Sequence, residues 1–311
     1  MGLLIATGGP LLRAQEEPKP AEAKEAPAAP QAEPASEGNP AAEGAPGANP
    51  TETLRGARER LSGASIRSVK ARLIERVSIG DRKFTAEGSY LQGPDLKIRL
   101  EFRVSIGSGK GKLEGSLLEV CDGTVLWTRN AIGKQPRITR RNVRQILDAA
   151  KSSDLQTILT AELGLGGLPA VLASLDKSMD FKTQRDEQIN GKTFTMIQGE
   201  WNEAYRERFK GVSKKGRLPE HIPDAVRVYF EPDILFPRRI EFLKRVEDGE
   251  KLSELVQLDL VDIVLNGPVD EMAFQFEKSE NEFPVDITDA YLQQLNATMP
   301  APAVETPAAP Q

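Results

Sequence analysis

The sequence predicts a mainly β protein with helices, an α+β fold: a curled, half-open antiparallel β-barrel with helices as a lid in its mouth. Three observations support this fold class: long stretches in which apolar and charged residues alternate, short turn signals between them, and one-sided helices in the middle of the chain. Alternation gives each strand one apolar face. About ten or eleven such strands form a sheet large enough to curl or close, and the helices would cover its concave face.

The 311 residues divide by composition into four segments. Residues 1–15 are expected to be a truncated signal peptide, because a short apolar run precedes small residues suited to cleavage; an ordinary disordered N-terminus is the alternative. Residues 16–50 are rich in Pro, Ala and Glu and are expected to form a disordered tether. Residues 297–311 repeat this composition as a disordered tail, which leaves 51–296 as the globular domain.

Composition argues against several classes of function. Residues 16–50 carry seven glutamates and two lysines, which accounts for the net charge of −5, so residues 51–296 are neutral overall and offer no electrostatic case for nucleic-acid binding. The single cysteine, Cys121, and the single histidine, His221, argue against a disulfide, a cysteine-based metal site or a hydrolase triad. No catalytic residue, metal ligand or cofactor is predicted, and an enzyme is not expected. No window has the roughly 18 apolar residues of a membrane span.

The first half of the domain is predicted to be a helix followed by an antiparallel meander. The helix is expected over residues 51–62, with Thr51 as its N-cap. Turns are expected at Gly80–Asp81, at Gly93–Pro94 and in the glycine-rich stretch 107–111. Between these turns, alternation predicts strands over the ranges 69–79, 84–90, 95–106 and 113–120.

The stretch Asp95–Ile106 is the most regular of these strands. Its apolar residues fall on every second position, with charged residues or serine between them. At about 3.3 Å per residue, the strand would span roughly 40 Å. The apolar positions are Leu96, Ile98, Leu100, Phe102, Val104 and Ile106.

A hairpin and three helices occupy the middle of the chain. Asp122–Gly123 is a dipeptide typical of a type I′ turn, and Trp127 lies on the strand that leaves it. Helices are predicted over 141–151, 154–163 and 168–179. The apolar faces that would form the lid comprise Val143, Ile146, Leu147 and Ala150 in the first helix and Leu168, Val171, Leu172 and Leu175 in the third.

The second half of the domain returns to strands. They resume at Asp180, and Asn190–Gly191 is a second hairpin dipeptide. Residues 202–223 are polar and basic and are expected to form an exposed helix or loop. A closing helix is expected near the end, with Asp286 or Thr288 as its cap. The predicted strands cover 225–231, 238–246, 252–265 and 272–276, and the closing helix covers 286–295.

Several local motifs follow one another along residues 65–290. They are GSYLQGPDLKIRL (88–100), DGTVLW (122–127), the stretch 226–242 followed by 261–276, and DITD (286–289). In sequence and in the order of elements, these motifs resemble the LolA/LolB-like lipoprotein carriers of the bacterial periplasm, with this chain as a distant member.

The resemblance implies an unclosed antiparallel barrel whose helices cover an apolar cavity. It implies a non-enzymatic, soluble periplasmic carrier whose ligands are acyl chains of lipoproteins or lipids, and whose protein partners would be inner- or outer-membrane lipoprotein-handling proteins. Each buried methylene contributes about 0.8 kcal/mol, so exposing a long acyl chain costs on the order of 10 kcal/mol. One departure concerns release: LolA has an Arg-Pro dipeptide where this chain has Gly93–Pro94. The arginine that bears on release in that family has no match here.

The candidate ligand-binding residues are the apolar positions of the long strands and of the lid. Filled interiors are the rule in proteins, so each of these residues has core packing as its alternative. The corresponding alternative function is a cell-envelope structural or interaction module with a filled core. The candidate cavity residues are Tyr90, Leu96, Ile98, Leu100, Phe102, Val104, Trp127, Ile146, Leu147, Val171, Leu172 and Leu175.

Overall fold

The structure, a computed structural model, describes residues 49–298 with short gaps. The gaps are 63–64, 81, 107–112, 133–135, 210, 212–216, 247–250 and several positions between 151 and 166. Outside the described residues lie the predicted signal peptide, nearly all of the predicted tether and of the C-terminal tail, the glycine-rich stretch 107–112 and most of the predicted helix 154–163.

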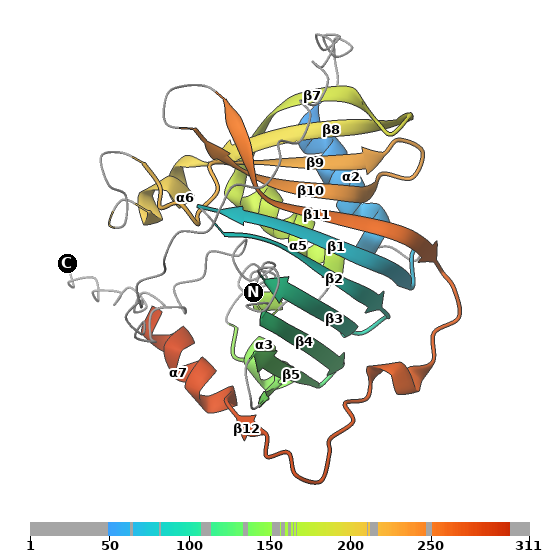
Figure 1. Ribbon diagram of the computed structural model, residues 1–311, viewed down its shortest axis with the longest axis vertical. Coiled ribbons are helices and arrows are strands. Elements are labelled where there is room, and N and C mark those ends of the chain that lie inside the picture. Colours follow the sequence, from blue (N-terminus) through green and yellow to red (C-terminus); the bar gives the residue numbers. More distant parts are fainter. Residues whose placement is uncertain are drawn as a thin grey trace, which may run out of the picture.

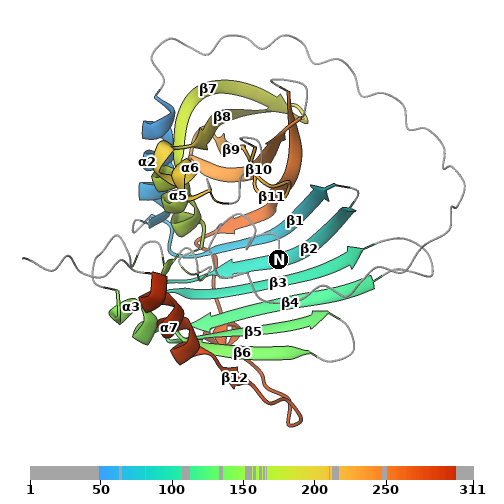
Figure 2. The same ribbon diagram turned by 90° about the vertical axis from the view of Figure 1, so that its left-hand side faces the viewer.

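The described strands form one curled sheet that is not closed (Figure 1, Figure 2). Its strand order is β12-β6-β5-β4-β3-β2-β1-β11-β10-β9-β8-β7. The short β12 pairs with β6 in parallel, and the other neighbouring strands are antiparallel. The strands are β1 (Val69–Ile79), β2 (Arg82–Gln92), β3 (Lys97–Ile106), β4 (Leu113–Asp122), β5 (Val125–Ile132), β6 (Arg137–Asn142), β7 (Met179–Ile189), β8 (Lys192–Trp201), β9 (Ala225–Glu231), β10 (Phe236–Arg245), β11 (Leu252–Leu265) and β12 (Val285–Asp286).

Two meanders make up this sheet, and they meet where β1 pairs with β11. Val69 pairs with Leu265 and Val77 with Val256, so the first and the last long strands of the domain lie side by side. Figure 2 shows the meander β7–β11 strongly curled and the meander β1–β6 flatter. The predicted curled, half-open α+β fold is therefore confirmed.

Helices lie beside the concave side of the curled half. α2 and α5 pack against each other and against β7, and Figure 2 shows them next to the curled strands. α7 contacts α3 near the other end of the sheet. The helices are α2 (Pro50–Ser62), α3 (Val143–Asp148), α5 (Gly167–Ser178), α6 (Glu203–Arg208) and α7 (Thr288–Thr298), with the 3₁₀-helix η3 (Glu271–Phe274).

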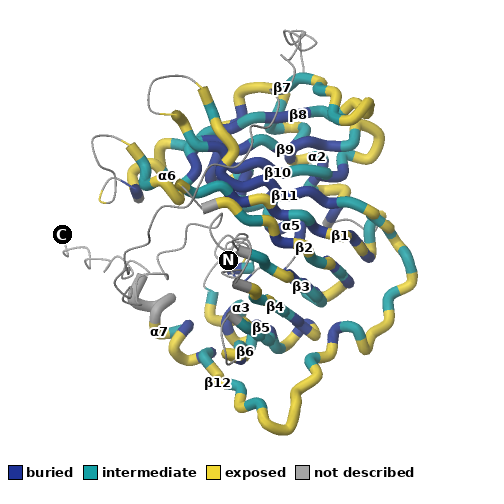
Figure 3. The backbone as a smooth tube through the Cα atoms, viewed as in Figure 1, coloured by how far each residue is buried: buried dark blue, intermediate teal, exposed yellow. Residues whose placement is uncertain are grey.

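The two faces of the sheet differ in composition. We call the face that carries Ile98, Leu100 and Phe102 of β3 the inner face, and the face that carries Arg99 and Arg103 the outer face. The main apolar core joins the inner face with residues from α2, α3 and α5. Buried positions are dense along β8–β11 (Figure 3).

The central strand is shorter than predicted at its start. It begins at Lys97, because Asp95 and Leu96 adopt positive φ angles of 57° and 65° in a tight turn. The Gly93 N–H donates to the Lys97 carbonyl oxygen at 2.9 Å and closes this turn. Leu96 therefore leaves the predicted alternation, although it still packs against the core.

Three other local predictions also need correction. Asn49, not Thr51, caps α2: its Oδ1 accepts a hydrogen bond from the Thr51 N–H at 3.0 Å, and Pro50 takes the first helical position that suits proline. The chain between β4 and β5 turns at Gly123 and Thr124, one residue later than expected. The predicted strand 272–276 contains the 3₁₀-helix η3 instead.

The predicted helix 141–151 is present but shorter than expected. Arg141 and Asn142 belong to β6, and α3 spans only Val143–Asp148. Asn142 ends the strand because its Oδ1 accepts from the Gln145 N–H at 3.0 Å and caps the helix. The stretch 202–223 contains α6 as expected, but it is not fully exposed, because Phe209 is buried.

Candidate functional site

Rows of apolar side chains cross the inner face from β1 to β3. Directly paired residues point to the same side of a sheet, so the register places Ala71, Tyr90 and Leu100 in one row. The next row contains Leu73, Gly88 and Phe102. These rows are continuous with β11, where Leu260 pairs with Leu73. The long predicted strand therefore presents its apolar positions to the concave side.

The lid helices α3 and α5 bury their apolar faces against the inner face. Leu172 has no exposed surface and Leu175 is 5% exposed, and both belong to the same core as Leu100. The structure thus brings most of the candidate residues together. Buried in this core are Tyr90, Ile98, Leu100, Phe102, Ile146, Leu172 and Leu175, and partly buried against it are Leu96, Val104, Leu147 and Val171.

Trp127 is the exception, because it lies on the outer face. The register aligns it with Val120 and Arg99, whereas its neighbour Leu126 aligns with Ile98 on the inner face. Its ring stacks on Phe276 at 4.9 Å between centroids and 5° between planes. The prediction that Trp127 lines the concave cavity is therefore wrong.

A segment from the C-terminal part of the chain covers this outer surface. We call residues 267–287 the crossing segment. Phe274 is buried over Gly93, and Arg99 donates to the Ala273 carbonyl oxygen at 3.2 Å. Arg129 forms an ion pair with Glu282 at 2.5 Å, and the Ser279 N–H together with this guanidinium lowers the pKa of the Glu282 carboxyl. The crossing segment leads into α7, where Asp286 accepts hydrogen bonds from Thr288.

Tyr90 connects strand β2 to the start of lid helix α5. The Leu168 N–H donates to Tyr90 Oη at 3.2 Å, and Tyr90 Oη donates to Gln92 Oε1 at 2.5 Å. Gly167 precedes this contact with a φ of 56°, and a Cβ atom there would lie 2.0 Å from Tyr90 Oη. Burial raises the pKa of Tyr90 far above its usual value. The neutral hydroxyl thus holds the first turn of α5 on the sheet.

Polar side chains also occupy the inner face, and the sequence analysis did not single them out. Glu75 lies between Leu73 and Val77 on β1, and burial raises the pKa of its carboxyl. Its signal was visible, because it interrupts an alternating apolar pattern. On the flatter half, the register places Glu119 and Thr128 beside Leu100 in one row. Arg141, paired with Leu126, lies on the same face but was assigned to a helix.

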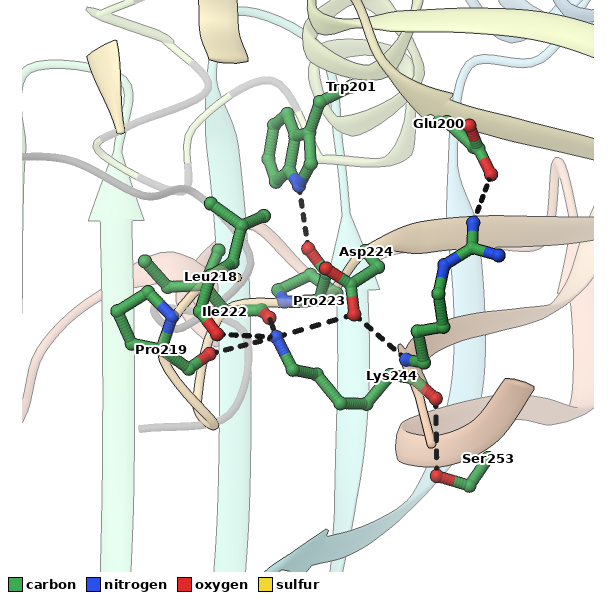
Figure 4. A network of polar contacts seen from close by, with 10 residues as sticks. Glu200, Trp201, Leu218, Pro219, Ile222, Pro223, Asp224, Lys244 and Ser253 are labelled. Carbon is green, nitrogen blue, oxygen red and sulfur yellow. Dashed lines mark hydrogen bonds and ion pairs between the residues drawn. The ribbon is translucent and has the colours of Figure 1, made fainter. Parts of the chain in front are cut away.

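One end of the curled half is closed by a network around Lys244 (Figure 4). Lys244 Nζ donates to the carbonyl oxygens of Leu218, Pro219 and Ile222 at 2.8–3.0 Å and lies 3.3 Å from the Asp224 carboxylate. Beside it, Trp201 Nε1 donates to the Pro223 carbonyl oxygen at 2.6 Å. These contacts hold the 218–224 loop over the core.

Two cavities in the structure lie away from the lid. One, of about 530 Å³, is bordered by Arg67, Pro94 and Asn266 near the β1–β11 end. The other, of about 550 Å³, lies between Arg99 and Arg129 of the sheet and the crossing segment. Neither of these two cavities is lined by the predicted inner-face residues, because the lid helices pack directly on those residues.

Cys121 is the candidate nucleophile that the sequence offers, and it is buried. Burial raises the pKa of the Cys121 thiol to about 11, so the thiol stays protonated and is a poor nucleophile. Within the described ranges, no group of three or more His, Cys, Asp or Glu side chains is placed to hold a metal ion. No helix in the described part of the chain combines the length and the apolar character that crossing a membrane requires.

Comparisons with known proteins find similarity at the level of solved structures. No family model matches the sequence, and no curated protein matches it. LprF from Mycobacterium bovis matches with 11% identity and a TM-score of 0.39, covering 71% of this chain and 94% of that one. A putative outer membrane lipoprotein-sorting protein domain from Vibrio parahaemolyticus matches with 11% identity and a TM-score of 0.32, covering 73% and 97%. A DUF1329 family protein from Desulfovibrio piger has 11% identity, a TM-score of 0.29 and coverage of 73% and 98%.

A putative lipoprotein-sorting domain is therefore among the solved structures to which this chain is similar. An identity of 11% and TM-scores below 0.5 carry no functional assignment. The function of this chain is therefore inferred from its own structure.

Proposed function

We propose that this protein is a non-enzymatic binder or carrier of acyl chains of lipoproteins or lipids. The observation that supports it is how the apolar inner face is covered. Its strands do not close into a barrel; α2, α3 and α5 cover that face instead. A cover made of separate helices can move, whereas a closed sheet cannot.

The energetics of this arrangement suit reversible binding. A long acyl chain gains on the order of 10 kcal/mol from leaving water, at about 0.8 kcal/mol per methylene. The lid contributes leucine, valine and isoleucine side chains of the same chemistry, among them Ile146 and Leu172. When an acyl chain replaces these side chains on the inner face, one apolar contact exchanges for another. The net affinity then stays low enough for release.

A second candidate function is a cell-envelope interaction module with a filled core. The specific observation in its favour is the tight packing of the lid, since Ile146 and Leu172 are fully buried and the two cavities lie elsewhere. In this case the lid would stay in place and the outer surfaces would do the binding.

The experiment that separates these functions measures lipid uptake by the full chain with a matched pair of variants. Val104 is partly buried on the inner face, and the neighbouring Arg103 is exposed on the outer face. Val104→Asp is expected to weaken uptake of a neutral fluorescent fatty alcohol by about tenfold or more, because a carboxylate there opposes an apolar chain. Arg103→Asp is expected to bind like the wild type.

Circular dichroism and thermal melts establish that both variants are folded. Equal uptake by the two folded variants would assign lipid binding to another surface. A wild-type protein that takes up no fatty alcohol would support the filled-core module.

The proposal includes an exported location. The apolar start of the chain followed by a Pro/Ala/Glu-rich segment is typical of a secreted domain on a tether. Inner- or outer-membrane proteins that handle lipoproteins would then be the partners that load or unload it.

A further inference from the structure

Within the flatter half, polar side chains join the apolar ones on the inner face of β4, β5 and β6. Starting from Leu100 on β3, the row continues with Glu119, Thr128 and Thr139 on β4, β5 and β6. The row beside it runs from Ile98 through the buried Cys121 and Leu126 to Arg141. At about 4.8 Å between strands, β6 lies roughly 14 Å from β3. The inner face is thus apolar from β1 to β3 and gains polar groups toward β6, an arrangement that suits an amphiphile.

Arg141 is the distinctive group of this polar end. Its Nη2 donates to Thr128 Oγ1 at 3.2 Å, which fixes the guanidinium on the inner face. Its Nε is buried and has no hydrogen-bond partner, and Arg141 forms no ion pair with any residue that the structure describes. A partly buried guanidinium that keeps one N–H without an acceptor costs free energy. An anion bound at Arg141 would remove that cost.

The surrounding charges also favour an anion. Arg137 lies on the same strand and the same face, two strand positions beyond Thr139. Glu119 is the nearby carboxylate on this face; burial raises its pKa, and the charge of Arg141 offsets only part of that rise, so Glu119 is a weak counter-ion. The planar guanidinium fork matches carboxylate and phosphate oxygens, which an ammonium group does not.

We propose that Arg141 and Thr128 form a headgroup subsite that binds the anionic oxygens of an acyl lipid whose chain lies along the apolar rows of the inner face. This inference rests on the proposed function and specifies its ligand as an anionic lipid, with a carboxylate or phosphate head. Thr128 positions the guanidinium, and Arg141 contacts the ligand.

The test compares oleate with oleyl alcohol, which has the same chain and no charge, by calorimetry on the full chain. A charge-assisted hydrogen bond corresponds to roughly ten- to a hundredfold in affinity. The wild type is therefore expected to bind oleate at least tenfold more tightly than the alcohol. R141Q is expected to lose this preference and to keep its affinity for the alcohol within about twofold.

The matched control is R129Q. Arg129 also has a buried Nε without a hydrogen-bond partner among the described residues, but it lies on the outer face and pairs with Glu282. R129Q is expected to leave both affinities unchanged. T128V, which keeps the charge of Arg141, is expected to reduce oleate affinity severalfold, and it serves if R141Q does not fold.

Each outcome decides the question. The subsite is overturned if R141Q and T128V bind oleate as tightly as the wild type does, or if R129Q loses as much oleate affinity as R141Q. Acyl-chain binding by the protein is unaffected by either result. A wild type that binds neither lipid overturns the proposed function and the subsite with it. Two further ligands extend the test. Tighter binding of oleoyl lysophosphatidate than of oleate would assign a phosphate head to the ligand. Binding of inorganic phosphate by a protein that binds neither oleate nor oleyl alcohol would overturn the lipid assignment.

Discussion

Glu75 is the one charged side chain on the apolar side of β1. It is 5% exposed, and Leu73 and Val77 flank it on that face. No residue in the described part of the chain gives its carboxylate a hydrogen bond or ion pair, so burial dominates and raises its pKa. Single residues of this kind interrupt an alternating pattern and can be found from sequence, although the pattern does not say what they bind.

Glu75→Gln is expected to stabilise the protein at pH 7.5 by about 1–3 kcal/mol, because it removes a buried charge without a partner. The folded-state pKa lies above the unfolded value, so the native state binds more protons and stability falls as pH rises from about 4.5. The wild type and Glu75→Gln should therefore have similar stability at pH 4 and diverge toward neutral pH. Urea unfolding at several pH values measures this.

The control for this measurement is Glu87→Gln, since Glu87 is exposed on the neighbouring strand. A Glu87→Gln protein that gains as much stability as Glu75→Gln would show a general charge effect. An equal difference between wild type and Glu75→Gln at pH 4 and pH 7.5 would contradict the raised pKa.

Trp127 lies on a face of the sheet that the alternation of apolar and polar residues could not identify. Val125, Leu126 and Trp127 are consecutive apolar residues, so the alternation there does not identify the inner residue. The stacking partner Phe276 decides it, and that residue is far away in the chain. The inner-face positions of β3 were predictable because charged residues separate them. The face on which Trp127 lies was not predictable, because apolar residues precede it.

At the scale of elements, α5 depends on a single polar anchor at its start. Tyr90 Oη accepts from the Leu168 N–H, and Gly167 allows the close approach. Further along, Arg58 of α2 forms an ion pair with Asp176 of α5 at 2.9 Å. The sequence predicted the helix and its apolar face, but the anchor depends on a contact between β2 and α5 that no local pattern contains.

Tyr90→Phe is expected to loosen α5 without unfolding the sheet. The substitution leaves the Leu168 N–H without its acceptor, at a cost of about 1–3 kcal/mol, and keeps the ring in the core. Hydrogen exchange followed by mass spectrometry should show faster exchange at residues 167–178 and unchanged exchange in β9 and β10. If acyl chains enter beneath α5, uptake should also become faster.

Tyr229→Phe is the matched comparison, because Tyr229 also donates a hydroxyl hydrogen bond, to Glu241 Oε2 at 3.1 Å, but lies on the outer face, away from the core that contains α5. It should leave exchange in α5 unchanged. Protection of α5 that is equal in wild type and Tyr90→Phe would show that the anchor contributes nothing.

The crossing segment is the second element that local patterns did not reveal. Only its residues 272–276 were predicted, as a short strand. Aromatic contacts place the segment on the outer face: Phe276 stacks on Trp127, and Arg129 lies over the Phe276 ring at 4.8 Å. Such contacts join side chains separated by most of the domain, which periodicity cannot detect.

Phe276→Ala is expected to release the crossing segment locally. It removes the stack on Trp127, at a cost of about 3 kcal/mol or less because Phe276 is only half-buried. Limited proteolysis should then cleave between residues 270 and 283 more rapidly. Phe283→Ala is the control, since Phe283 is 85% exposed and its loss should change little. Equal cleavage rates in the two variants would rule out the stack as the anchor.

At the scale of the whole molecule, Asp259 of β11 joins the two meanders. Arg76 of β1 approaches it at 2.6 Å, and Arg239 of β10 approaches its other oxygen at 2.6 Å. Sequence patterning predicted an open, curled sheet, because both halves contain enough one-faced strands. It could not predict that β1 would lie beside β11, since many antiparallel registers satisfy the same alternation.

The β1–β11 pair also sets the order in which the molecule can assemble. Val69 pairs with Leu265, so this junction waits until nearly the whole domain has been synthesised. Contacts between distant segments make folding slow. Each meander can form hairpins early, but the common core can form only after the last long strand has been synthesised. For a protein that is exported unfolded, this delay would keep the chain unfolded for longer before it crosses the membrane.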